Sequence, residues 1–192
     1  MHEQKRVDVK VWDPLIRLLH WSLVASFFSA YFSEEDLLDL HVYAGYLVLG
    51  LVIFRVVRGF VGSRHARFSD FVRPPAVVID YLRDVVTFRA RRYLGHNPAG
   101  RVMVVVLLVM LFLICVSGLV LYGADESAGP LAAMMAGVGE FWIDALEEVH
   151  EFLANFTLLL VLFHVIGVLL ATRQHHENLV YSMITGYKRR LE

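Results

Sequence analysis

The sequence has almost no cysteine. Cys115 is the single cysteine among 192 residues, so the chain cannot form an internal disulfide. It cannot form a CxxC metal site either, because such a site needs at least two thiolates. Cys115 lies in a long apolar run, where a buried cysteine acts as a small apolar side chain.

Basic residues are also missing from two long stretches. None of the 18 Lys and Arg residues lies between His20 and Phe54 or between Val102 and Thr172. The composition is 57% hydrophobic and the mean hydropathy is +0.56, which is too apolar for an ordinary soluble domain. These features exclude a nucleic-acid-binding module and favour a membrane protein.

Four apolar segments are each long enough to cross a bilayer as a helix, which takes about 17–25 residues. They cover residues 15–32, 38–57, 102–122 and 152–172. The first segment lacks a clear cleavage site, so we interpret it as a retained span and not as a signal peptide. We predict an all-α fold, an integral membrane four-helix bundle, in which residues 1–192 form a single domain.

The charge distribution predicts the orientation of the chain. By the positive-inside rule, both termini and the loop at residues 58–101 are cytoplasmic in a bacterial inner membrane. The inner segments then sum to a charge of +10 and the outer segments to −11. Such an acidic outer face would attract a basic soluble partner. The alternative is that translocated loops only avoid Lys and Arg.

The two longer loops each predict an interfacial helix. Residues 77–95 can separate apolar and basic side chains onto two faces, as helices lying along a membrane surface do. Residues 130–146 predict a second such helix on the outer side, anchored by Trp142.

Four histidines lie in the spans or at their edges: His20, His41, His150 and His164. Ionisable side chains at membrane depth are costly, and they face the bundle interior as functional candidates. His150 and His164 are 14 residues apart, about 40° short of four full helical turns, so they share one face roughly 21 Å apart. This distance is too long for one metal ion and predicts two sites.

Depth predicts how the histidines pair. His20 and His164 are both near the cytoplasmic side, while His41 and His150 are both near the outer side. Two imidazoles at one depth suit a haem iron with both axial positions filled, which favours electron transfer over oxygen binding. Without a CxxCH motif, such a haem is held non-covalently. The alternative is that each histidine is a hydrogen-bonded packing residue.

Three arginines are candidates for binding haem propionates. Arg55 follows His41 by 14 residues and so shares its face at cytoplasmic depth, where a propionate could pair with it. Arg17 and Arg58 are further candidates. For Arg58 the alternative is that its side chain only reaches the inner surface of the membrane.

Together, several motifs resemble the bacterial di-haem cytochrome b family, which includes membrane subunits of nickel–iron hydrogenases and stand-alone relatives. The resemblance rests on "WDPLIRLLHW", "HVYAGYLVLGLVIFRVVRGFVG", "YLGHNPAG", the two histidines of the last span and "HHENLVYSMITGYKR". It implies four helices that hold two b haems, with the four histidines above as ligands. It also implies electron transfer between a quinone near the cytoplasmic side and a redox partner outside.

The resemblance further implies quinone contacts at Asn97 and Gly100, although a helix start also explains these residues. The chain is shorter than typical hydrogenase subunits and lacks an extra helix, which favours a stand-alone quinone–cytochrome shuttle.

The expected function is electron transfer between the quinone pool and a periplasmic carrier such as a c-type cytochrome. A dehydrogenase or hydrogenase subunit is a further partner class, and a homodimer is a further assembly to test. Quinol or quinone oxidoreductase activity would then need no catalytic side chain. One alternative is a small cytochrome b that oxidises superoxide and reduces quinone, but no basic residue lies outside to guide the anion. Another is a transition-metal transporter, whose ligands usually gather near the midplane.

Overall fold

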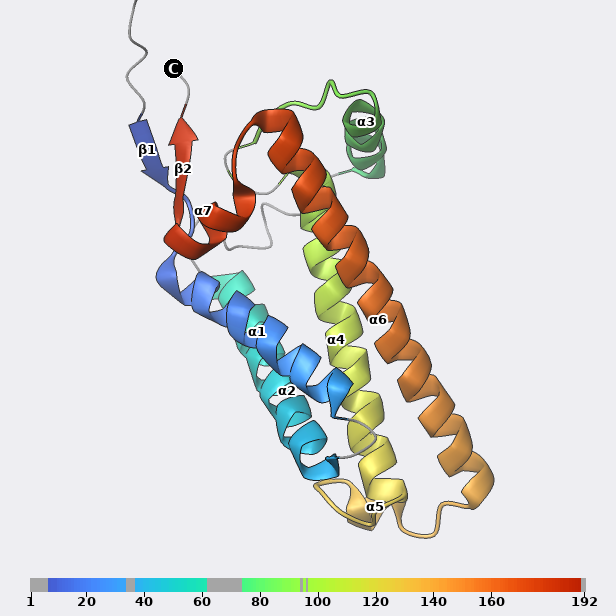
Figure 1. The fold of residues 1–192 in the computed structure, drawn as a ribbon. Coiled ribbons are helices and arrows are strands. Elements are labelled where there is room, and N and C mark those ends of the chain that lie inside the picture. Colours follow the sequence, from blue (N-terminus) through green and yellow to red (C-terminus); the bar gives the residue numbers. More distant parts are fainter. Residues whose placement is uncertain (1–6, 34–36, 62–73, 94, 96, 191–192) are drawn as a thin grey trace, which may run out of the picture. The chain divides into compact units, whose positions relative to one another are not determined.

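Four long helices dominate the computed structural model, which describes residues 7–33, 37–61, 74–93, 95 and 97–190. They are α1 (Pro14–Phe32), α2 (Leu38–Val61), α4 (Pro98–Ala124) and α6 (Glu140–His175), as shown in Figure 1. All four are long and apolar enough to cross a membrane. The predicted fold class, an all-α membrane helical bundle, is therefore confirmed.

Local sequence signals explain where two of these helices begin. Asp13 precedes α1, and its carboxylate accepts a hydrogen bond from the backbone N–H of Leu15 at 2.7 Å. Pro14 then occupies the first helical position, where a missing N–H costs nothing. Asn97 and Pro98 repeat this arrangement at the start of α4, because Asn97 Oδ1 accepts from the N–H of Gly100 at 2.7 Å.

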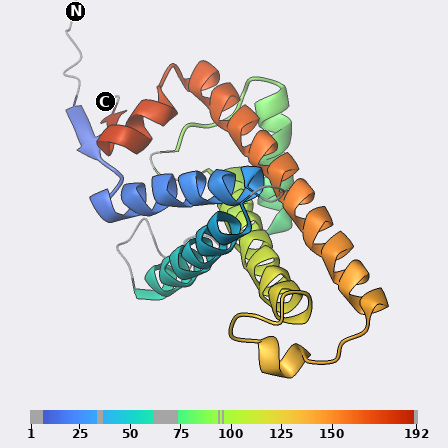
Figure 2. The ribbon, with the colours of Figure 1, turned by 60° about the horizontal axis from the view of Figure 1, so that its bottom comes forward.

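The loop between α4 and α6 differs from the prediction. The only helix wholly within it is α5 (Ala132–Met135), a single turn between α4 and α6 (Figure 2). Trp142 does not anchor a separate interfacial helix, because α6 begins at Glu140 and runs without a break through the predicted fourth span. Residues 140–151 include four Glu residues together with Ala145 and Leu146, all strong helix formers, and neither Gly nor Pro, so the helix continues beyond its apolar part.

The loop between α2 and α4 contains an amphipathic helix, α3 (Pro75–Val86), which ends nine residues before the predicted end at residue 95. Phe88 follows it with a φ of 56°, which no α-helix continues through. Tyr81 is buried and its ring meets that of Tyr93, with 5.7 Å between the ring centres. Ile79, Leu82 and Val86 form a second apolar face that is exposed. Such a face suits a lipid surface, and the interfacial position of α3 stays a prediction.

A small terminal assembly was not predicted from the sequence. Strand β1 (Val7–Lys10) pairs antiparallel with β2 (Tyr187–Arg190), in a register that sets Val7 opposite Arg190 (Figure 1). The short helix α7 (Leu179–Thr185) precedes β2 and ends at Gly186, whose φ of 91° lies in the left-handed region. The Gly186 carbonyl accepts hydrogen bonds from the N–H groups of Val11 and Trp12, which fastens the two ends of the chain together.

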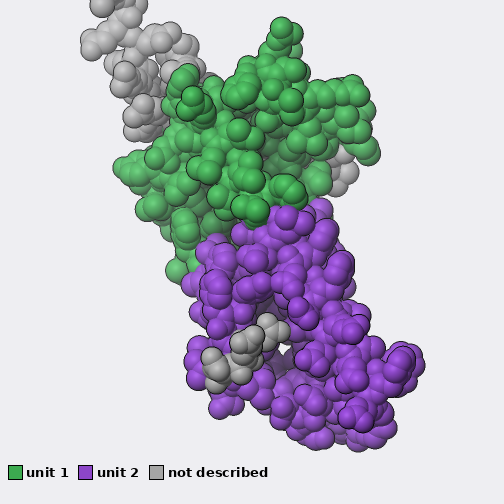
Figure 3. All heavy atoms as spheres, turned by 45° about the vertical axis from the view of Figure 1, so that its right-hand side comes forward, with its two compact units in different colours: residues 1–21, 54–105, 162–192 green, residues 22–53, 106–161 purple. Residues whose placement is uncertain are grey.

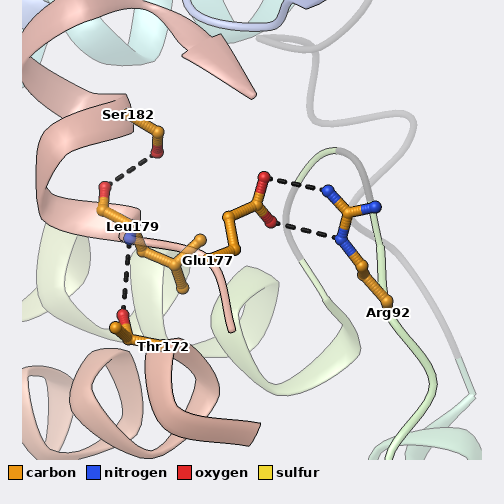
Figure 4. A network of polar contacts seen from close by, with 5 residues as sticks. All are labelled: Arg92, Thr172, Glu177, Leu179 and Ser182. Atoms are coloured by element: carbon orange, nitrogen blue, oxygen red, sulfur yellow. Dashed lines mark hydrogen bonds and ion pairs between the residues drawn. The ribbon is translucent and has the colours of Figure 1, made fainter. Parts of the chain in front are cut away.

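A buried ion pair holds this assembly to the segment between α3 and α4. Glu177 is 9% exposed and accepts from Arg92 through Nη2 at 2.9 Å and Nε at 3.3 Å (Figure 4). Thr172 Oγ1 accepts from the N–H of Leu179 at 3.4 Å and so joins α6 to α7. Burial lowers the pKa of the nearby Lys188 ammonium; the charge of Glu177 opposes this shift and that of Arg92 adds to it.

The chain divides into two compact units, coloured separately in Figure 3. Unit 1 contains Met1–Trp21, Phe54–Val105 and Leu162–Glu192, and unit 2 contains Ser22–Ile53 and Val106–Val161. Unit 2 has 11 Asp and Glu residues in its sequence but no Lys or Arg. One predicted histidine pair falls in each unit. The assignment of residues 1–192 to one functional domain stays a prediction.

Candidate functional site

His41 and His150 lie together in unit 2. His41 is near the start of α2 and His150 is on α6, and their ring centres are 6.0 Å apart with the ring planes at 74°. An imidazole nitrogen binds a metal ion at about 2 Å, so one ion between two imidazoles would hold the ring centres roughly 6 Å apart. The structure thus brings this predicted pair to a spacing that suits a shared ion.

The ring of His41 is oriented by the end of α1. Its Nδ1 lies 2.9 Å from the carbonyl oxygen of Ala30, which can only accept a hydrogen bond. Nδ1 must therefore carry the proton, and Nε2 keeps its lone pair for a metal ion. Ala30 is in the last turn of α1, where carbonyl groups carry the negative end of the helix dipole, and its carbonyl also accepts from the N–H and the hydroxyl of Ser33, each at 3.2 Å.

The ring of His150 is oriented by α4. Its Nδ1 lies 2.8 Å from Ser117 Oγ, and that hydroxyl also donates to the carbonyl of Ile114 at 2.9 Å. On the same helix, a Cβ placed on Gly118 would lie only 2.9 Å from His150 Cε1. The imidazole thus rests against α4 at a position that only glycine allows without displacement.

Both histidines line a cavity in unit 2. Gly45 lies on its wall, and a Cβ added there would meet no atom within 4 Å. Three tyrosines also line it, and one of them, Tyr31, donates a hydrogen bond to Asn155 Oδ1 at 2.7 Å. The remaining lining side chains are mainly apolar; they are Phe27, Ala30, Val42, Val48, Leu49, Leu111, Ile114, Cys115, Leu119 and Ala154.

The second predicted pair lies in unit 1. His20 on α1 and His164 on α6 are close enough for their imidazoles to interact electrostatically. The His20 ring meets Trp21 edge-on, with 5.1 Å between the ring centres. His20 Nδ1 is buried and has no hydrogen-bond partner among the described residues, so this imidazole has bonding capacity that these residues do not use.

The three candidate arginines also belong to unit 1. Arg55 is buried, with 8% of its surface exposed. Arg58 Nη2 pairs with Asp13 Oδ2 at 3.3 Å, and Arg17 Nη1 donates to the carbonyl of Ile184. The Nε atoms of Arg17 and Arg58 are buried without an acceptor among the described residues, so each guanidinium keeps a donor for an anionic group.

Comparison with known proteins decides the family. The sequence profile described as prokaryotic cytochrome b561 matches residues 11–186. The chain belongs to this family. A relative from Rhizobium leguminosarum bv. viciae, named as a probable Ni/Fe-hydrogenase B-type cytochrome subunit, is 24% identical over 216 aligned positions. That alignment covers 95% of this chain and 89% of the relative. No solved structure matches the chain.

Membership of the cytochrome b561 family identifies a multi-pass membrane b-type cytochrome that acts in electron transfer. The family implies haem b, and the unit 2 cavity fits such a group. Two imidazoles lie there with 6.0 Å between their ring centres, each with its Nδ1 engaged by another group, and the walls are mainly apolar. No cluster of three or more His, Cys, Asp or Glu side chains that could hold a metal ion occurs within the described residues. A haem needs only two protein ligands, because its ring supplies the others.

The predicted quinone residues have a clear structural role. Asn97 caps α4, and Gly100 receives this capping bond; a Cβ at Gly100 would lie 3.2 Å from Asn97 Oδ1. The helix-start alternative therefore accounts for both residues. Their contact with quinone stays a prediction, and the neighbouring His96 lies outside the described residues.

Sequence reasoning missed the groups that orient His41 and His150. Ser117 was not predicted to contact a histidine, although a hydroxyl in an apolar span is a signal for a buried hydrogen bond. The Ala30 carbonyl carries no signal of its own in the sequence. It becomes a candidate only once α1 is known to end two residues later, at Phe32.

Proposed function

We propose that this cytochrome transfers electrons between the quinone pool and a redox partner outside the membrane, using two b haems. His41 and His150 would hold one haem in unit 2, and His20 and His164 would hold the other in unit 1. The observation that carries the proposal is the cavity shared by His41 and His150, with both Nδ1 atoms already committed to other groups. When bound, a bis-histidine haem supplies one-electron redox chemistry without an open position for oxygen.

Charge assigns further roles to unit 1. Arg17, Arg55 and Arg58 would neutralise the propionates of the haem held by His20 and His164, since guanidinium groups pair well with carboxylates. We place this inner haem in the cytoplasmic half of the bacterial inner membrane, with both termini cytoplasmic, because the basic residues are confined to those segments. Quinone would exchange electrons there, near Asn97 and Gly100.

The external partner that best fits unit 2 is a soluble carrier with a basic docking face, such as a c-type cytochrome. Unit 2 contains 11 acidic residues and no basic one, which would steer such a carrier toward it. A hydrogenase-type subunit is the alternative partner, suggested by the name of the relative. Because the alignment covers 89% of that relative, length alone does not separate the two classes.

A haem count on purified single variants tests the ligand assignment. The pyridine haemochrome of the wild-type protein should give two b haems per chain. His41→Ala and His150→Ala should each lose one haem, and His20→Ala and His164→Ala should each lose the other. The haem that remains should have one redox potential in the first two variants and a different one in the last two. His176→Ala is the matched control, because this histidine is exposed beyond the end of α6. If all four ligand variants kept two haems, the assignment would be wrong.

Quinone exchange needs a separate test. A water-soluble quinol added to the oxidised protein should reduce the haems, and the rate should fall in Asn97→Asp, in which a capping side-chain oxygen is kept. Reduction at an unchanged rate in that variant would remove Asn97 from the proposed quinone site.

A further inference from the structure

Ser117 is placed to control how His150 binds iron. We propose that Ser117 is a positioning residue of the unit 2 site, which fixes the tautomer and ring orientation of His150 and lowers the reduction potential of the haem bound there. The proposal rests on the proposed function in one respect, namely that His150 is an axial ligand. The main evidence is the chain of contacts from the Ile114 carbonyl through the Ser117 hydroxyl to the His150 imidazole.

When Nε2 binds iron, the ring proton is on Nδ1, and the proton count then sets the direction of both hydrogen bonds. A serine hydroxyl has one proton, and a carbonyl oxygen has none to donate. The Ser117 hydroxyl donates to Ile114 at 2.9 Å, so toward His150 it can only accept, at 2.8 Å. The Ser117 oxygen therefore favours a proton on Nδ1, which leaves the lone pair on Nε2.

Gly118 adds a steric restraint on the same ring. His150 Cε1 lies 2.9 Å from the place where any other residue at position 118 would carry its Cβ. The imidazole is thus held by a hydrogen bond at Nδ1 and by close contact with α4 at Cε1. Ser117 and Gly118, which are neighbours on α4, therefore limit the motion of the ring at two adjacent ring atoms.

The partner imidazole is controlled differently. His41 Nδ1 donates to the backbone carbonyl of Ala30, and no side-chain substitution removes that oxygen. Among these contacts, only the Ser117 hydroxyl belongs to a side chain. A substitution at position 117 can therefore change how strongly His150 donates to iron.

The electronic effect has a definite sign. A hydrogen bond donated from the ring nitrogen remote from the metal makes the imidazole a stronger donor through its other nitrogen. A stronger donor stabilises oxidised iron more than reduced iron, which lowers the reduction potential. Loss of the Ser117 acceptor should therefore raise the potential. A tenfold weaker preference for oxidised iron corresponds to a rise of about 59 mV for one electron.

Ser117→Thr and Ser117→Val form a matched pair for the test, because the two side chains share a shape and differ in the hydroxyl. Ser117→Ala is the smaller companion variant. Ser26→Ala is the control, since the Ser26 hydroxyl also bonds a backbone carbonyl in unit 2, that of Ser22 at 2.8 Å, but bonds no histidine among the described residues. Each full-length protein would be purified with haem and analysed by haem count, potentiometric titration and low-temperature EPR of the oxidised form.

We expect two haems in every variant, with one potential raised in the Val and Ala variants only. The EPR signal of the same haem should change in these two, because it reports the orientation of the axial imidazoles. The Thr and Ser26→Ala variants should match wild type. Equal potentials in the Thr and Val variants would overturn the role of the hydroxyl while leaving the haem assignment standing. A His150→Ala protein that retained both haems would instead overturn the assignment itself.

Discussion

At Gly118 the backbone of α4 comes so close to the His150 ring that no side chain fits between them without a shift. Gly118→Ala would set a methyl group 2.9 Å from Cε1 of that ring, so the imidazole must shift. Because metal sites depend on supporting groups by about 10–100-fold in affinity, we expect the unit 2 haem to be lost or to dissociate at least tenfold faster. Haem transfer to an apoprotein acceptor, followed by absorbance, measures this rate.

Gly50→Ala is the matched control on α2. A Cβ at position 50 meets no atom within 4 Å, and alanine is about 1 kcal/mol more favourable than glycine inside a helix. This variant should retain both haems. Equal haem loss in the two variants would show that the close contact at Gly118 is not the cause.

The sequence singles out four histidines as candidate ligands, but it does not reveal the groups that orient His41 and His150. An imidazole within an apolar span is costly, so His20, His41, His150 and His164 stand out without a structure. The groups that contact the His41 and His150 rings, the Ala30 carbonyl and the Ser117 hydroxyl, belong to other helices. Neither residue type is unusual in an apolar helix. Ser117 could equally have bonded only its own helix, as Ser26 does, and its contact with His150 depends on how α4 and α6 pack.

At the scale of whole elements, hydropathy located the spans but not all of their ends. The predicted span 38–57 and the helix Leu38–Val61 begin at the same residue. The fourth span was predicted to start at residue 152, while α6 starts at Glu140. Hydropathy reports the part of a helix that suits lipid, but backbone hydrogen bonds continue wherever helix-forming residues follow. The same reason made Trp142 appear to belong to a separate helix.

Helix α7 and the strands show what short-range signals leave out. Asn178 caps α7 through a 2.8 Å bond to the N–H of Tyr181, and Gly186 ends it. These two residues flank a short apolar run and could have predicted the helix. The strands could not be found this way, because β1 and β2 lie at opposite ends of the sequence and each has only four residues.

The ion pair between Arg92 and Glu177 should stabilise the docking of α7 and β2. Removing one partner of a buried pair typically costs about 3–5 kcal/mol; because the Arg92 side chain is 23% exposed, we expect Glu177→Gln to cost roughly 1–3 kcal/mol. Amide hydrogen exchange in residues 177–190 should accelerate, and the unfolding temperature in detergent should fall.

The exposed pair of Asp80 and Arg83 supplies the control. Its side chains are 72% and 78% exposed, and such pairs contribute about 0–1 kcal/mol. Asp80→Asn should leave hydrogen exchange in the C-terminal segment unchanged. If Glu177→Gln behaved in the same way, the ion pair would hold no part of that segment.

At the scale of the molecule, charge is segregated between the units. Four exposed acidic residues lie along the first turns of α6 in unit 2: Glu140, Asp144, Glu147 and Glu148. Changing all four to their amides should slow electron exchange with a basic soluble cytochrome without changing haem content. The wild-type rate should also fall as salt rises, because exposed charges are screened beyond about 8–10 Å at physiological ionic strength. Stopped-flow absorbance measures both effects.

Asp80→Asn combined with Asp84→Asn is the matched control, since both residues are exposed on α3 in unit 1. That variant should keep the wild-type rate and salt dependence. A rate indifferent to salt and to the four changes on α6 would mean that the acidic residues only reflect the topology of the chain. The partner would then dock elsewhere or be an integral membrane subunit.

The pairing of β1 with β2 also decides whether the number of membrane crossings is even or odd. Two strands can exchange backbone hydrogen bonds only if they lie on the same side of the bilayer, and β1 precedes every candidate span while β2 follows them all. The chain must therefore cross the membrane an even number of times, whichever way it is inserted. Three or five crossings would set hydrocarbon between Val7 and Arg190. This constraint owes nothing to the distribution of Lys and Arg, so a reporter fused to one end of the chain also locates the other.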